Sequence, residues 1–195
     1  MRGLLFLTLA CLLASTLGGC ATPVTVDYLT LTSPAQAAIR SDAPPISVGP
    51  VTLPDYLKRN GLARRDSDGA LHYSMSELWA EPLDQGMQRT LIEILSDALE
   101  DTSVTDFPGP SALQAHYGVS ISVRRLEATD GVARLSASWR ILPTSSVSPR
   151  PTLTGRFSRE KPLVSPSGPA VARAFSALVH ALALDIAGAI PARDS

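Results

Sequence analysis

Motifs for catalysis and ligand binding are scarce in this chain of 195 residues. Its three histidines, His72, His116 and His180, have no metal-ligand spacing, and the only cysteines are Cys11 and Cys20. There is no Gly-x-Ser-x-Gly elbow, no phosphate-binding loop and no glycine-rich dinucleotide turn. These absences argue against the common hydrolases, nucleotide-binding enzymes and structural zinc sites, so no cofactor and no metal are predicted. A catalytic triad assembled from distant Ser, His and Asp residues stays an open alternative.

An excess of charge is also absent. Lys and Arg total 17 against 18 Asp and Glu, a formal net charge of -1. This balance gives no indication of a nucleic-acid partner or of a strongly anionic surface. Hydrophobic residues make up 45% of the chain, enough to bury a core within one domain.

The first residues have the layout of a secretory signal. Arg2 precedes an apolar run over 4–13, and small residues follow. The run is too short for a membrane-spanning helix, which needs about 20 apolar residues. Leu17-Gly18-Gly19-Cys20 resembles the lipobox of bacterial lipoproteins. The resemblance implies cleavage before Cys20, with a diacylglyceryl group on its thiol and an N-acyl group on its amine. An ordinary secreted protein with a chance cysteine is the alternative.

This interpretation divides the chain into four parts: a signal peptide over 1–19, a lipidated tether over 20–23, a single domain over 24–190 and a short tail over 191–195. Only Cys20 remains after cleavage, so the mature chain has no internal disulfide. Ala21 follows the cysteine, where lipoproteins retained in the inner membrane tend to carry Asp. The resemblance therefore points to the periplasmic face of the outer membrane.

Hydrophobic periodicity predicts the secondary structure. Apolar and polar residues alternate over 24–31, 46–53, 71–75, 104–107, 119–124, 134–141 and 152–158, which predicts strands. The last three form an antiparallel meander with a hairpin turn at Asp130-Gly131. Apolar stripes predict helices over 84–100 and 168–190. The predicted fold class is α+β, a mostly antiparallel sheet with two main helices packed on one face.

The second helix is apolar enough to raise the question of a membrane span. Residues 170–190 are largely apolar over a spanning length. Arg173, His180 and Asp185 argue against that interpretation, because each would cost several kcal/mol in mid-bilayer. The sequence favours a helix packed on the sheet.

Two polar groupings are candidate sites. Lys58, Arg59, Arg64 and Arg65 could bind an anionic ligand, but a solvated loop is favoured. Glu77 and Glu81 flank Trp79 and could form an acid pair, for which a solvated strand edge is the favoured alternative. No catalytic residue is assigned from either grouping.

Three sequence blocks resemble the ABC-type transport auxiliary lipoprotein family. The matching residues are Tyr28-Leu29, Val48-Gly49-Pro50-Val51 with Leu53-Pro54-Asp55-Tyr56-Leu57 and Arg59, and Trp79-Ala80-Glu81-Pro82-Leu83. The lipobox and the strand with Trp139 agree. The chain departs after Arg59, where the family often has Pro-Gln and this sequence has Asn60-Gly61.

The resemblance implies a non-enzymatic outer-membrane lipoprotein. It would act as a docking component, or as a component that forms a homo-oligomeric ring, in an ABC-type or Pqi-type system. The mammalian-cell-entry (MCE) domain protein of such a system moves lipids between membranes. A periplasmic carrier that holds lipid among Trp79, Trp139 and Phe175 is an alternative, although these aromatics are better explained as core. A lipid-anchored hydrolase is a further alternative that the motifs disfavour.

Overall fold

A computed structural model describes residues 25–34, 38–40, 42–144 and 151–192. Its larger sheet has the strand order β5-β2-β6-β7-β8. The bounds are Val104–Asp106 for β5, Ile46–Thr52 for β2, Tyr117–Thr129 for β6, Val132–Pro143 for β7 and Leu153–Pro162 for β8. The antiparallel meander predicted from the alternation is present as β6, β7 and β8. Asp130 and Gly131 both have positive φ, the backbone conformation that a two-residue type I′ hairpin turn requires.

A second sheet of three strands has the order β1-β4-β3. β1 (Asp27–Leu29) pairs in parallel with β4 (Leu71–Trp79), and β4 pairs antiparallel with β3 (Gly61–Arg65). Short 3-10 turns, η1 (Asp55–Leu57) and η2 (Pro110–Gln114), follow β2 and β5.

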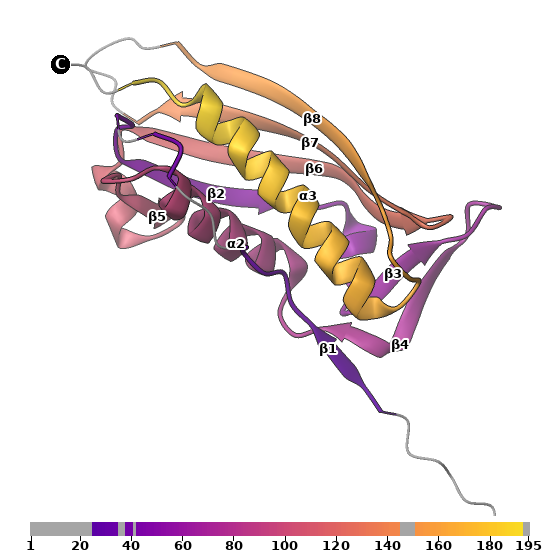
Figure 1. The fold of residues 1–195 in the computed structure, drawn as a ribbon. Coiled ribbons are helices and arrows are strands. Elements are labelled where there is room, and N and C mark those ends of the chain that lie inside the picture. The colour runs from indigo at the N-terminus through magenta and orange to yellow at the C-terminus, as the bar shows by residue number, and fades with distance from the viewer. Residues whose placement is uncertain (1–24, 35–37, 41, 145–150, 193–195) are drawn as a thin grey trace, which may run out of the picture.

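Two helices cover one face of the larger sheet, as Figure 1 shows. Helix α2 (Leu83–Ala98) buries an apolar stripe that includes Met87, Leu91 and Leu95. Helix α3 (Gly168–Ala189) packs on β7, β8 and α2, and most of its residues are buried. By length and mean hydropathy, 1.5, α3 would also suit a membrane span, but here it fills the core.

The α+β class and the two helices are therefore confirmed, while the sheet is mixed rather than purely antiparallel. β2 lies parallel to both β5 and β6. The chain between β2 and β5 includes α2, and a helical crossover of this kind returns the next strand in the parallel direction. Periodicity alone could not show this, because it reveals the faces of a strand and not its neighbours.

Candidate functional site

The face of the larger sheet opposite the helices carries mainly small polar side chains. Successive residues of a strand point to opposite faces, so Val119 of β6 lies in the core and Ser120 lies on the outer face. The outer face is lined by Ser47, Pro50, Thr52, Ser120, Ser122, Ser138, Arg140, Thr154 and Arg156.

A hollow of about 560 Å³ lies on this outer face, and we call it the sheet-face hollow. Arg140 on β7 is opposite Thr154, and Arg156 on β8 is opposite Ser138, so the two arginines are diagonal neighbours. Both are exposed, and neither forms an ion pair among the residues described. Two unmatched guanidinium groups suit carboxylate or phosphate oxygens, which they bind in a planar, two-pronged geometry.

An adjacent hollow of about 350 Å³ is more apolar, and we call it the apolar hollow. It shares Pro50 and Ser120 with the sheet-face hollow. Phe107, Leu113 and Leu142 line it and are 45%, 92% and 38% exposed. Exposed apolar side chains that cluster around a concavity are typical of binding surfaces. Together the two hollows form one continuous candidate site.

The rim of the apolar hollow depends on a close backbone approach at Gly49. Its φ is +128°, and a Cβ atom there would lie 2.3 Å from the carbonyl oxygen of Phe107. Gln88 of α2 donates from Nε2 to the carbonyl oxygens of Val48 (3.1 Å) and Phe107 (3.0 Å). The structure therefore explains the glycine in the Val48–Val51 block. Only glycine adopts this φ readily and leaves room for the Phe107 carbonyl oxygen.

The basic cluster divides into two pairs: Lys58 and Arg59 are exposed in the loop after η1, as the sequence favoured, whereas Arg64 and Arg65 are not in a solvated loop. Arg64 and Arg65 lie on β3, where their ion pairs bring them to partly buried positions. Arg65 binds both carboxylate oxygens of Glu127, at 3.0 and 3.1 Å. Arg64 pairs with Glu77 at 2.9 Å, and the Arg59 guanidinium lies 4.7 Å from the centre of the Tyr73 ring. For Arg64 and Arg65 the prediction failed because their partners are distant in sequence. The pairing also leaves these two arginines poorly suited to an anionic ligand.

Tyr56 of the second family block lies beside the Arg65–Glu127 pair. Burial, together with the Glu127 carboxylate, raises the pKa of Tyr56 to about 12. The phenol therefore stays protonated at physiological pH. The Arg65 guanidinium also lies 5.9 Å from the centre of its ring, so Tyr56 packs as a structural side chain.

Glu77 and Glu81 do not form an acid pair, nor do they lie on a solvated edge. Glu77 accepts hydrogen bonds from Arg64 and, at 2.6 Å, from the backbone N–H of Gly168 at the start of α3. Glu81 instead binds Arg89 at 2.6 Å, and Arg89 also donates to the carbonyl oxygen of Leu31. Each carboxylate thus ties different segments together, and neither faces the two hollows.

The acid dependence of stability gives a test of the Glu77 contacts. Burial pushes the pKa of Glu77 upward, but the Arg64 guanidinium and the Gly168 N–H outweigh it and hold the pKa below its usual 4.5. A lowered pKa in the folded state means that this stabilisation is complete above pH 4.5 and is lost as the pH falls through the lowered pKa. Glu77→Gln should therefore lower the free energy of unfolding at pH 7 by about 1–3 kcal/mol, and much less in acid.

Denaturant unfolding across this pH range measures the effect. Glu93→Gln is the matched control, because Glu93 forms an exposed i,i+4 pair with Arg89 and should cost only about 0.3–0.5 kcal/mol. A Glu77→Gln deficit that does not change with pH would contradict the assigned role.

The aromatic side chains considered for lipid binding pack in the core, as the sequence favoured. Trp79 and Phe175 stack with ring centroids 6.3 Å apart, and both are buried. The buried Trp139 donates from Nε1 to Asp185 Oδ2 at 2.8 Å. None of the three provides an open apolar cavity for an acyl chain.

The histidines do not converge on one another in the structure. His72 contacts Asp66 at 2.9 Å in the exposed β3–β4 hairpin, whereas His116 precedes β6 and His180 lies within α3. Within the described ranges, no group of three or more His, Cys, Asp or Glu side chains is placed to hold a metal ion.

The predicted signal, Cys20 and the tether up to residue 23 lie outside the described residues, as does the tail over 193–195. Of the residues that do line the hollows, Arg140 and Arg156 are placed on the polar face by simple strand alternation. Nothing in the local pattern marks Phe107 or Leu113, because they lie outside the regular strands.

Fold and surface together define a small α+β domain with an uncovered, hollowed sheet face. The family model of the ABC-type transport auxiliary lipoprotein component matches residues 28–187, and the chain belongs to this family.

Particular relatives agree with this assignment. The chain is 32% identical over 102 residues to the intermembrane transport lipoprotein PqiC of Escherichia coli K12 and, equally, to that of Shigella flexneri. The match covers 52% of this chain and 53% of each relative, so the chain spans about half the length of the curated relatives it matches.

Two solved structures share the fold. A crystal structure of an uncharacterized protein, 22% identical, has a TM-score of 0.69 and covers 85% of this chain and 98% of its own. A Xanthomonas campestris protein, 16% identical, has a TM-score of 0.61 with 84% and 91% covered. At these identities the likeness concerns the fold alone.

Proposed function

We propose that this chain is an outer-membrane-anchored auxiliary lipoprotein of an ABC/MCE-type, Pqi-like intermembrane lipid transport system. Its signal occupies 1–19, lipid on Cys20 and a tether over 20–23 hold it at the periplasmic face, and one domain over 24–190 docks on an MCE-domain protein. Family membership and the lipobox support the setting of this proposal. The continuous pair of hollows on the outer sheet face is the observation that carries the docking role.

The composition of these hollows suits a protein partner. Interfaces between proteins are enriched in aromatic residues and Arg and combine an apolar centre with a polar rim. Here Phe107, Leu113 and Leu142 supply apolar contacts, while Arg140 and Arg156 supply unmatched positive charge beside them. We expect the docking segment to present an apolar side chain next to a carboxylate.

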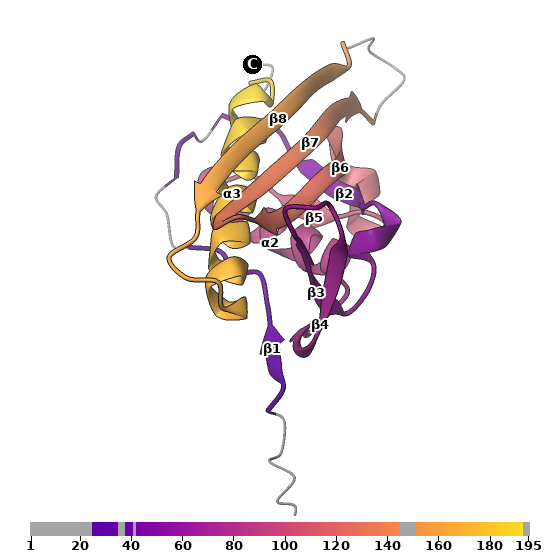
Figure 2. The same cartoon turned by 90° about the vertical axis from the view of Figure 1, so that its right-hand side faces the viewer.

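The position of the apolar hollow fits this role. β5, which leads directly into Phe107, lies away from β1 in both Figure 1 and Figure 2. Because the lipidated residue precedes β1, an anchored body turns the β5 end away from its own membrane. A partner that crosses the periplasm would meet that end.

Self-association into a ring is part of the same proposal. β8 is an edge strand of ten residues, and an unpaired edge can add a strand from another molecule. Lys161 and Pro162 close one end of this edge, so pairing would use the segment from Leu153 onward. The carrier alternative is weaker, because Trp79 and Phe175 stack on each other and Trp139 is buried with its Nε1 bonded to Asp185.

Photo-crosslinking in native membranes tests the docking surface. A photoreactive phenylalanine at Leu113, which is 92% exposed, should give an adduct with an MCE-domain protein. The same group at Val164, 85% exposed and near the start of α3, is the matched control and should give no such adduct. If neither position captures an MCE-domain protein, and none co-purifies after general cross-linking, the docking role is wrong. Capture from residue 164 alone would place docking on another surface.

A further inference from the structure

The exposed apolar side chains of this protein fall mainly into two groups at different ends. Phe107, Leu113 and Leu142 belong to the apolar hollow, described above. A second group consists of Val26, Tyr28, Met75 and Val164, which are 37%, 69%, 90% and 85% exposed. Their exposure calls for a separate explanation, because no element among those described covers them.

Three chain segments bring the second group together, and Glu77 is their junction. In the β1–β4 pairing Asp27 is opposite Glu77, which places Val26 and Tyr28 beside this part of β4. The Glu77 carboxylate also accepts a hydrogen bond from the Gly168 N–H. This bond holds the end of the β8–α3 connection, which contains Val164, at β4. Val26, Tyr28 and Met75 therefore lie on the two strands that pair at Glu77, and Val164 lies on the connection between Leu163, which bonds to Gly131, and Gly168, which bonds to Glu77.

The backbone of β4 projects Met75 outward. On β3, Gly61 pairs with Leu78 and Ala63 pairs with Tyr73. The four residues 74–77 of β4 therefore lie opposite one residue of β3, residue 62. The Ser74 hydroxyl oxygen accepts the N–H groups of Ser76 (3.3 Å) and Glu77 (2.9 Å), which closes a compact bulge. Bulges redirect side chains, and this one places a large apolar residue in solvent.

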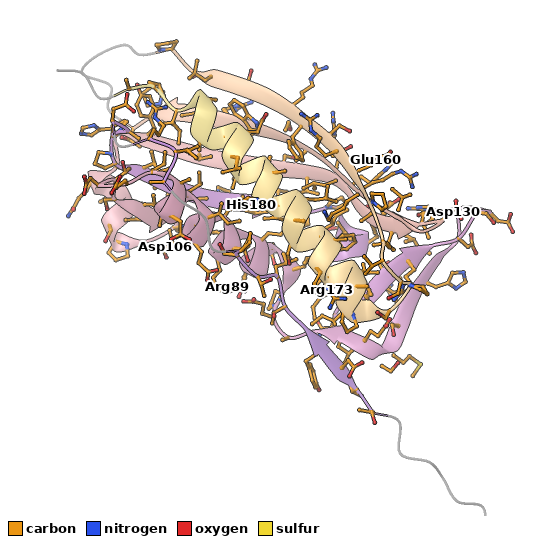
Figure 3. The ribbon with its side chains drawn as sticks, viewed as in Figure 1. Arg89, Asp106, Asp130, Glu160, Arg173 and His180 are labelled. Atoms are coloured by element: carbon orange, nitrogen blue, oxygen red, sulfur yellow. The ribbon has the colours of Figure 1, made fainter. Side chains whose placement is uncertain are left out.

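A cation lies beside this group. Arg173 is exposed on α3 and forms no ion pair among the described residues, and it lies toward the β1 end of that helix (Figure 3). Arg173, Tyr28 and Pro169 line one hollow of about 300 Å³, together with Asp27. An aromatic with a polar tip, exposed apolar side chains and a neighbouring Arg suit the boundary between lipid headgroups and acyl chains.

The proposed anchor fixes how far this end can be from lipid. Four residues lie between Cys20 and Thr25, the first described residue, and the five residue-to-residue steps that join them span at most about 18 Å. We propose that the end formed by Val26, Tyr28, Met75 and Val164 rests on the outer-membrane bilayer, with these side chains in its headgroup region. This inference rests on the proposed lipid attachment, and it adds a fixed orientation that a freely swinging tether would not give.

Fluorophores at single cysteines test the orientation. Lipidation blocks Cys20 and signal cleavage removes Cys11, so Met75→Cys and Leu113→Cys each provide one reactive thiol for an environment-sensitive dye. The lipidated full-length protein is reconstituted in phosphatidylethanolamine–phosphatidylglycerol vesicles that contain spin-labelled lipid. The dye at residue 75 should shift to the blue, be quenched by lipid labels placed about 5–10 Å deep, and show several-fold weaker iodide quenching than the dye at residue 113.

A second sample separates failure of the orientation from failure of the anchor. In it, Cys20→Ser carries an amino-terminal hexahistidine segment that binds nickel-chelating lipid, so the body is tethered without acylation. Blue-shifted, lipid-quenched fluorescence at residue 75 in this sample supports the orientation even if native Cys20 proves unmodified. Equal iodide quenching at residues 75 and 113 in both samples, with the protein still floating with the vesicles, overturns it.

Discussion

Replacing Trp139 by alanine is expected to lower the free energy of unfolding by about 3–5 kcal/mol, the usual cost of emptying a buried tryptophan site. The indole is 8% exposed, so nearly all of its area is buried. On the neighbouring strand Gly155 faces it, and a Cβ atom at that glycine would lie 2.1 Å from the ring. Because the ring fills the space that Gly155 leaves, β7 and β8 cannot close the cavity without moving their backbones.

Equilibrium unfolding in denaturant measures this cost, with Cys20→Ser in every sample to keep the chain soluble. Trp139→Phe is the matched control: it keeps an aromatic ring but removes the donor to Asp185. The free energy of unfolding of this variant should fall by about 0.5–1.5 kcal/mol for the lost hydrogen bond. The smaller ring should lower it slightly further. If alanine and phenylalanine cost the same, the hydrogen bond outweighs the packing and our account of this core is wrong.

Cys20→Ser is expected to have the largest effect on cellular location. Acyl chains add about 0.8 kcal/mol for each buried methylene, and two anchoring signals already hold a protein stably. Without the thiol the chain should appear as soluble periplasmic protein, or remain uncleaved in the inner membrane. Fractionation with an antibody against the body measures the shift.

The fold of the Cys20→Ser body should be unchanged, because the described body begins at Thr25, beyond the substituted residue. Circular dichroism of the purified variant provides this control, and Ala21→Ser, one residue away, should leave the location unaltered. Continued fractionation of Cys20→Ser with the outer membrane would show that something other than lipid holds the protein there.

The parts of this fold that sequence could predict are those with local causes. Alternation along β6, β7 and β8, with the Asp130-Gly131 turn, fixes which faces are buried and which strands follow one another. The apolar stripes of α2 and α3 fix the two helices in the same way. In each case the signal and the structure lie within one continuous segment.

The parts that could not be predicted depend on partners far apart in the chain. β3 contains Arg64 and Arg65, which resemble loop residues until Glu77 and Glu127 are placed beside them. The parallel pairing of β1 with β4 likewise joins segments that are about 50 residues apart. The candidate site has the same character. Arg140 and Arg156 follow from alternation, whereas Leu113 enters the apolar hollow only through the tertiary fold.

We propose different roles for the two ends of the body: one contacts the bilayer and the other docks a partner. Exposed apolar side chains lie on segments near Glu77, beside the proposed anchor, whereas β5, which leads into the apolar hollow, lies away from β1 (Figure 1). Both proposed roles require the proposed lipid at the amino terminus, because an unanchored body would have no preferred orientation toward either membrane.

Intact-mass spectrometry of the protein extracted from native membranes tests this dependence most directly. Our account predicts a chain that begins at Cys20 and carries a diacylglyceryl group together with one N-linked acyl chain. A mature product whose Cys20 thiol is free and unmodified would contradict it.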